Sequence, residues 1–139
     1  MKTFVSEWDG KTHFDPIIED MVGRTFTSVT STVDELVFKD ETGTFTFYHE
    51  YDCCESVEIE SIVGDLADLV GEPLLIAEEA KSDTNPEGVH HEYHESFTWT
   101  FYKFATRKGY VDVRWYGESN GYYSEEVDLK YEEKQNATD

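Results

Sequence analysis

The chain has 139 residues with 31 acidic and 11 basic side chains, so its formal net charge is −20 at pH 7. This length fits one domain, and the aromatic fraction of 15% can supply a core, which argues against a disordered chain. The negative charge argues against non-specific binding to nucleic acid or to an anionic membrane, because both surfaces would repel the protein. The sequence has neither an apolar run of about 20 residues nor the apolar segment of a signal peptide, so we expect a cytoplasmic protein.

Most of the chain shows the polar and apolar alternation, rich in β-branched and aromatic residues, that is typical of strands. We predict strands over residues 25–33, 35–39, 44–48, 56–62, 73–79, 97–105, 110–116 and 124–131. Two short helices are expected, one before Gly23 and one over residues 62–70, where apolar side chains recur at helical spacing. The predicted fold is therefore α+β, with one twisted antiparallel sheet of about seven or eight strands and two short helices. It forms a single domain over residues 1–131, followed by a frayed tail over 132–139.

The two halves of the chain resemble one another. Val22-Gly23 and Val70-Gly71 each close a short amphipathic segment and lead into a strand. We interpret this as two degenerate copies of a helix-then-strands unit, over residues 15–60 and 62–131, although any two antiparallel meanders share some of these features. If the copies are real, the turns at 50–55 and 118–125 are equivalent and lie near each other.

His49, Cys53 and Cys54 are the candidates for thiol catalysis, because a cysteine nucleophile needs a nearby base or cation to form the thiolate. The neighbouring carboxylates, which disfavour the thiolate, belong to Glu50, Asp52 and Glu55. Adjacent Cα atoms lie about 3.8 Å apart, which is shorter than the usual disulfide span, so we expect no ordinary bridge between the two cysteines. We interpret at least one of them as a small buried apolar residue at the start of a strand.

His90, His91 and His94 are the candidates for metal binding, and His49, Cys53 and Cys54 could add ligands. Zinc prefers such residues, but its structural sites use ligand pairs at defined spacings, and no companion pair is present. The three histidines lie in a polar loop over residues 81–95, where the alternative is plain solvation. We therefore predict no cofactor.

The segment Gly117–Glu125 contains Asn120-Gly121, a dipeptide that favours a hairpin turn. The turn does not account for the consecutive tyrosines Tyr122 and Tyr123. Neighbouring strand residues point to opposite faces, so one tyrosine can enter the core while the other stays outside. The segment is either a structural turn or a recognition loop whose outward tyrosine binds a partner.

Residues 40–79 contain twelve acidic side chains and no lysine or arginine. Strand alternation puts Glu58 and Glu60 on one face about 7 Å apart, close to the phosphate spacing of one DNA strand. Such a face could occupy the basic groove of a protein that handles nucleic acid. The alternative is an acidic surface that only confers solubility.

Two stretches resemble a protein family that is found in bacteriophages and prophages and is uncharacterised. They read Asp-Cys-Cys-Glu-Ser-Val over residues 52–57 and Gly-Glu-Ser-Asn-Gly-Tyr-Tyr-Ser-Glu over 117–125, and the resemblance extends over about residues 45–128. It implies a phage origin and no particular activity. A small acidic phage protein without a recognisable catalytic set is expected to be an accessory protein that acts by binding.

We therefore predict an inhibitor of a host enzyme of defence or nucleic-acid handling, in which the protein mimics nucleic acid and occupies a basic cleft. The predicted binding residues are Glu50, Tyr51, Asp52, Glu55, Glu58, Glu60, Arg114, Glu118, Asn120, Tyr122 and Tyr123. One alternative is a protein that sequesters a small ligand or nucleotide in a pocket lined by His49, Cys53, Arg114, Asn120 and Tyr122. The other alternative is a metal- or thiol-dependent enzyme, and the oligomeric state is left open.

Overall fold

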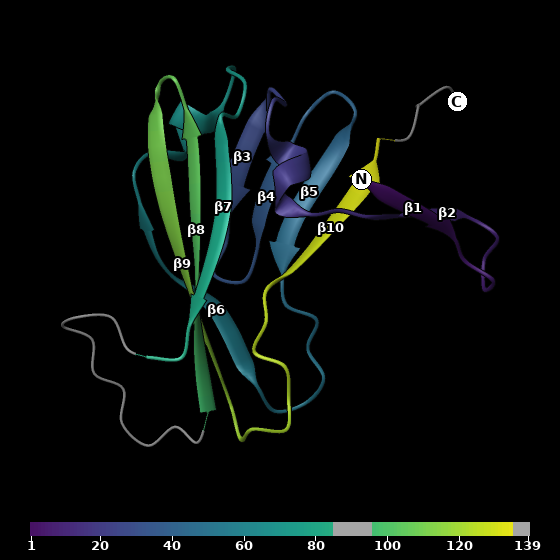
Figure 1. The fold of residues 1–139 in the computed structure, drawn as a ribbon, viewed down its shortest axis with the longest axis vertical. Coiled ribbons are helices and arrows are strands. Elements are labelled where there is room, and N and C mark those ends of the chain that lie inside the picture. The colour runs from purple at the N-terminus through teal and green to yellow at the C-terminus, as the bar shows by residue number, and fades with distance from the viewer. Residues whose placement is uncertain (85–95, 135–139) are drawn as a thin grey trace.

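The computed structural model describes residues 1–84 and 96–134, which consist almost wholly of antiparallel strands (Figure 1). The strands are β1 (Lys2–Val5), β2 (Thr12–Asp15), β3 (Ser28–Ser31), β4 (Leu36–Lys39), β5 (Gly43–Tyr48), β6 (Ser56–Val63), β7 (Ile76–Ser82), β8 (Ser96–Thr106), β9 (Gly109–Ser119) and β10 (Asp128–Glu133). Two single-turn 3₁₀ helices, η1 (Ile18–Met21) and η2 (Leu66–Leu69), complete the described elements. The prediction of an α+β fold is wrong, because the protein is nearly all-β.

Three antiparallel sheets replace the single sheet that we predicted. Strands β1 and β2 form a hairpin, which we call the arm, and two four-stranded sheets form the body. Sheet I has the order β10-β5-β4-β3, and sheet II has the order β6-β9-β8-β7. Each body sheet thus combines three consecutive strands from one half of the chain with a fourth strand from the other half.

The predicted helix over residues 62–70 is mostly absent because its first residues belong to a strand. The β-branched Ile62 and Val63 extend β6 and pair with β9. Gly64 then turns the chain with a φ of +112°, a left-handed conformation that glycine adopts without strain. Only the four residues of η2 remain helical, and η1 has the same length. No helix within residues 1–84 and 96–134 has the length and apolar character to cross a membrane.

The strands predicted over the two most aromatic stretches are confirmed, as β8 and β9, and both run longer than predicted. Strand β7 starts at Ile76 instead of residue 73, and β10 reaches Glu133, which we had placed in the frayed tail. The arm strands were not predicted. The proposed metal ligands His90, His91 and His94 lie outside the described residues.

The core lies between the two body sheets and is rich in aromatic rings. Phe38 on β4 packs against Phe104 on β8 with ring centroids 4.9 Å apart, and Phe47 on β5 packs against Tyr102 with 4.7 Å between centroids. These rings are fully or almost fully buried, as is Trp115 on β9. Facing positions on sheets I and II therefore supply one apolar layer, as expected for two packed sheets.

The two halves of the chain also contact each other reciprocally. The N–H of Gly23 donates to the carbonyl of Leu74 at 2.7 Å, and the N–H of Gly71 donates to the carbonyl of Phe26 at 2.8 Å. In the alignment of the halves, Gly23 matches Gly71 and Phe26 matches Leu74, so each bond is the counterpart of the other. The strand order has the same form in both halves, although an internal duplication as such stays an interpretation.

Candidate functional site

The turn after β5 (residues 49–55) and the turn after β9 (residues 120–127) lie together at one end of the body, at the bottom of Figure 1. We call this region the two-turn end. Pairing of Ser56 on β6 with Glu118 on β9 brings the turns side by side. Nδ1 of His49 lies 2.6 Å from the carbonyl oxygen of Glu126, and the N–H of Glu50 donates to the Asp128 carboxylate at 3.0 Å. Two segments that are far apart in the sequence therefore form one surface.

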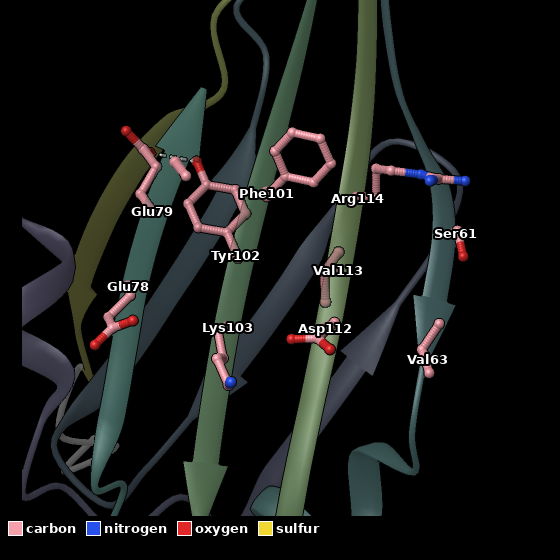
Figure 2. Close-up of a pocket in the computed structure, with 11 residues that line it drawn as sticks. Ser61, Val63, Glu78, Glu79, Phe101, Tyr102, Lys103, Asp112, Val113 and Arg114 are labelled. Carbon is pink, nitrogen blue, oxygen red and sulfur yellow. Dashed lines mark hydrogen bonds between the residues drawn. The ribbon is translucent and has the colours of Figure 1, made fainter. Parts of the chain in front are cut away.

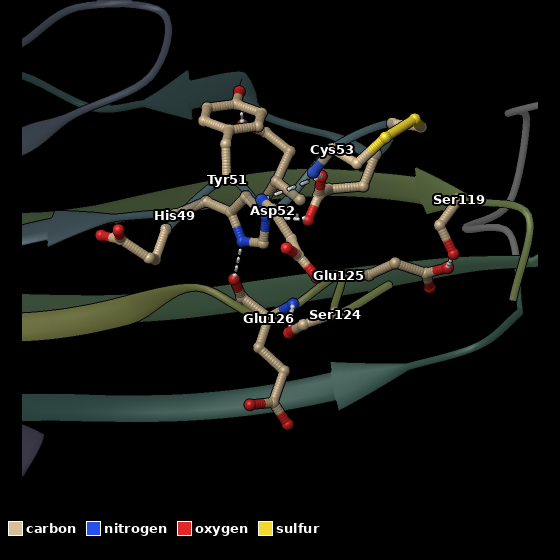
Figure 3. Close-up of polar contacts among 12 residues, drawn as sticks. His49, Tyr51, Asp52, Cys53, Ser119, Ser124, Glu125 and Glu126 are labelled. Atoms are coloured by element: carbon tan, nitrogen blue, oxygen red, sulfur yellow. Dashed lines mark hydrogen bonds and ion pairs between the residues drawn. A yellow bond between two sulfur atoms is a disulfide. The ribbon is translucent and has the colours of Figure 1, made fainter. Parts of the chain in front are cut away.

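The predicted catalytic residue His49 is buried beneath this surface. Its Nε2 lies 3.1 Å from a carboxylate oxygen of Glu55, and both side chains are at most 1% exposed. Figure 3 shows the His49 ring between the Glu126 carbonyl and the first turn. Both ring nitrogens lie within hydrogen-bond distance of acceptor oxygens, one from each turn. His49 thus fastens the two turns together and is not presented to a substrate.

Glu55 acts as the acceptor that closes the first turn. Besides the His49 contact, it accepts the N–H of Cys53 at 2.9 Å and the N–H of Asp52 at 3.2 Å. Burial favours the protonated carboxyl, but the backbone N–H groups and the His49 ring outweigh burial and lower the pKa of Glu55 to about 2. The carboxylate is therefore ionised at neutral pH and has a structural role.

The second turn contains a matching buried carboxylate, Glu125, which is absent from the binding residues predicted from the sequence. It accepts the Thr98 hydroxyl at 2.8 Å and the Ser119 hydroxyl at 2.5 Å. Ser119 precedes Glu125 by six residues, as His49 precedes Glu55. The shared Glu-x-Val-x-apolar pattern over residues 55–59 and 125–129 was the signal that could have identified this position.

Cys53 and Cys54 are joined in a disulfide between adjacent residues, where we expected no ordinary bridge. Both residues are exposed at the tip of the first turn, so neither is the buried apolar residue that we expected. No free thiol is present in the structure, and the proposed thiol nucleophile is therefore occupied. Within residues 1–84 and 96–134, no cluster of three metal-ligating side chains is found.

The aromatic side chains of the two-turn end differ in how they are held. Tyr51 is 49% exposed, but its hydroxyl donates to the Val57 carbonyl at 3.1 Å and its ring packs edge-on against His49. Burial raises the pKa of Tyr51, and the charge of Glu58 adds to the rise. Tyr122 is 89% exposed, whereas Tyr123 is partly buried. Tyr122 is therefore the aromatic group that this end offers most freely to a partner.

Glu58 and Glu60, the proposed phosphate mimics, do not contribute equally. A β-bulge between Ile59 and Ser61 disturbs the strand register at Glu60. The Glu60 carboxylate accepts the Nε–H of Arg114, whose guanidinium also lies over the ring of Trp99. Glu60 is thus neutralised by an ion pair, while the Glu58 side chain is exposed to solvent.

The excess negative charge lies on the surface. Among the described acidic residues, Glu55 and Glu125 are buried as whole residues, and the Asp40 side chain is only 8% exposed. Exposed carboxylates at or next to the two-turn end belong to Glu50, Asp52, Glu58 and Glu126. In the second turn, Asn120 caps the chain by accepting the N–H of Tyr122 at 3.0 Å. The end as a whole is an acidic surface with an exposed aromatic side chain.

The five residues of the predicted small-ligand pocket are not brought into one cavity. Arg114 lies on the outer face of sheet II, where it lines a hollow of about 430 Å³ together with Phe101 and Lys103 (Figure 2). His49, Cys53, Asn120 and Tyr122 do not line this hollow. The hollow beside Arg114 is therefore not the pocket that the sequence predicted.

Comparison with known proteins gives one match. The model of a family described as a domain of unknown function (DUF7448) matches residues 19–129, which include both body sheets apart from the last four residues of β10. No curated protein and no solved structure matches the chain.

Proposed function

The chain belongs to the family of the domain of unknown function DUF7448, and we propose that it acts by binding, with its two-turn end directed at a basic cleft of another protein. The observation that carries this proposal is the exposed Tyr122 beside solvent-facing carboxylates in a protein of net charge −20. The proposed partner is a host protein that handles nucleic acid. In this proposal the protein is a bacteriophage accessory factor that inhibits its partner.

Charge supports this kind of partner. The structure uses few acidic residues internally, so most of the negative charge remains available to a partner. A negative electrostatic field accelerates association with a basic surface and repels nucleic acid. In this proposal the protein competes with nucleic acid for that basic surface. Glu50, Asp52 and Glu58 provide this charge next to the turns.

Tyr122 supplies the second element of a protein interface, an aromatic anchor. Tyrosine is enriched among interface residues that contribute most of the binding energy, because it combines a large apolar ring with a hydroxyl. The buried contacts of Glu125 and the Asn120 cap hold the backbone on either side of Tyr122. A side chain presented on a fixed backbone loses less entropy when it is bound.

The test is a pull-down with the tagged protein from nuclease-treated bacterial lysate at about 0.1 M and about 0.5 M NaCl, with mass spectrometry of the captured proteins. We expect a nucleic-acid-handling protein to be retained at low salt and released at high salt. Purified partner is then titrated with variants. Tyr122→Ala should weaken binding about tenfold or more, and Glu58→Lys should slow association and reduce the salt dependence.

Matched controls come from the opposite end of the body. Tyr110→Ala removes another tyrosine that is 60% exposed, and Glu41→Lys reverses another exposed carboxylate in the turn between β4 and β5. Neither control should change affinity by more than about twofold. The proposal is wrong if binding is insensitive to salt, or if the controls weaken it as much as the two-turn variants do.

A further inference from the structure

The arm, formed by β1 and β2, projects from the side of the body (Figure 1). Its base is attached to sheet I, because the ring of Phe14 packs edge-on against Tyr131 on β10 with 5.1 Å between centroids. Its tip carries three exposed apolar side chains, namely Phe4, Val5 and the 98% exposed Trp8. The arm precedes residues 19–129, which match the family model.

The tip of the arm is apolar on both faces. Phe4 pairs with His13 and Val5 pairs with Thr12, and consecutive residues of a strand point to opposite faces. Trp8 lies in the connecting turn. A hairpin that docks onto a flat surface needs apolar side chains on one face only. Apolar side chains on both faces of the tip suit insertion into a hollow. A lone two-stranded hairpin is also only marginally stable in water, so docking would stabilise the arm.

Charge favours contact between arms and bodies of the same protein over contact between bodies. Residues 1–15 contain two basic and three acidic side chains, which leaves −1 on the arm and −19 on the remainder. Two bodies repel each other strongly, whereas the arm can approach a second copy with little repulsion. The arm also lacks the excess of carboxylates that would select a basic partner.

The hollow on the outer face of sheet II has the character to receive the tip. Its apolar part is formed by Val63, Ala80 and Phe101 (Figure 2). The two cations that line it are engaged within their own protein, because Lys103 lies over the ring of Tyr110 and Arg114 is paired with Glu60. On the arm, Glu7 and Asp9 flank Trp8. Attraction between opposite charges therefore does not select this pairing of tip and hollow. Glu78, Glu79 and Asp112 also line the hollow, so burial of apolar surface is the contribution that holds the tip.

We propose that the arm of one copy inserts Trp8 into this hollow on a second copy. A molecule's own arm cannot serve, because the arm is attached beside β10 of sheet I and the hollow opens on the outer face of sheet II. The three apolar side chains of one tip offer roughly 400 Å², and a stable interface needs about 800 Å² per partner. Two reciprocal insertions reach that area and close a two-fold dimer.

The test is sedimentation of the full chain over a range of protein concentrations at about 0.1 M and about 0.5 M NaCl. We expect a dimer that tightens as salt screens the repulsion between bodies. This salt dependence is opposite to that of the proposed partner complex, so the two ideas can fail separately. Trp8→Ala should raise the dimer dissociation constant about tenfold or more, and Ala80→Glu should do so by filling the hollow with a charge.

Two control variants keep the test specific. Val33→Ala shortens another apolar side chain that is 57% exposed, and Thr30→Glu adds a carboxylate to an exposed position on sheet I, and both should leave the dimer intact. Trp8 is too exposed for its truncation to unfold the protein, which circular dichroism would verify. A chain that stays monomeric at both salt concentrations overturns the proposal. So does a dimer that is insensitive to either Trp8→Ala or Ala80→Glu.

Discussion

Replacing Gly117 with alanine tests whether the two turns are packed as closely as the structure indicates. Gly117 lies on β9 opposite Val57 of β6, on the face that covers the second turn. A Cβ atom at this position would lie 2.7 Å from the carbonyl oxygen of Glu125 and 3.0 Å from the Glu125 Cβ. The first neighbour is backbone, so the clash cannot be relieved by rotating a flexible side chain.

Overpacking of this kind costs about 1–3 kcal/mol. With a urea m-value of about 2 kcal/mol/M, the unfolding midpoint should fall by about 0.5–1.5 M. The buried Trp99 and Trp115 provide the fluorescence signal for the titration. Because the strain displaces the turn that carries Tyr122, partner binding should weaken as well.

Gly121→Ala is the matched control in the same turn. Gly121 has a φ of +95°, and a Cβ atom added there would have no neighbouring atom within 4 Å, so alanine meets backbone strain without a clash. That strain costs about 1 kcal/mol. If Gly117→Ala leaves the midpoint unchanged, or lowers it no further than Gly121→Ala does, the close contact between β9 and the second turn is refuted.

Three further predictions concern the acid response, the core and the cysteines. The folded-state pKa of Glu55 is lowered from 4.5 to about 2, so its contribution to stability is present above pH 4.5 and is lost as the pH falls towards 2. Urea titrations at several pH values should show this loss in the wild type and lack it in Glu55→Gln. Phe104→Ala should lower the free energy of unfolding by about 3–5 kcal/mol in the same assay, because the ring is fully buried. Thiol titration in denaturant should detect no free thiol before reduction and two afterwards, since Cys53 and Cys54 are bridged.

The alternation of polar and apolar residues predicted the strands whose two faces differ most in burial. On β8, Tyr102 and Phe104 point into the core and Lys103 points to solvent, so the period of two is plain in the sequence. The helix over residues 62–70 was a false signal, because Ile62 and Val63 at the end of β6 happen to continue the spacing of Leu66 and Leu69. Hydrophobic periodicity cannot separate the end of a strand from a helix that follows it, because the pattern does not show where one element stops.

The arm could not be predicted for a different reason. Its strands have four residues each, and most of their side chains are exposed on both faces. Binary alternation arises from burial of one face, so a hairpin that projects from the body leaves little trace of it. The exposed position of Trp8 could not be predicted either, because a large apolar ring is normally assigned to the core.

At the two-turn end, the sequence identified the right segments but could not separate structural from exposed residues. His49 and Glu55 are buried because β10 and the second turn cover them, and this contact joins residues 77 positions apart. Local composition holds no information on such a contact. For the bridged pair Cys53 and Cys54, we expected no ordinary disulfide because we used a rule on typical spans, and that rule does not cover neighbouring residues.

The difference between structural and exposed carboxylates decides which charge reversals can test the binding proposal. Reversing Glu55 or Glu125 would place a cation among buried hydrogen-bond donors, and reversing Glu60 would set it against Arg114. Any loss of binding in these variants would reflect disturbed folding of the turns. Glu58 is exposed on the same strand as Glu60 and leaves the buried network intact. A partner that recognises acidic charge must therefore respond to Glu58→Lys while the unfolding midpoint stays that of the wild type.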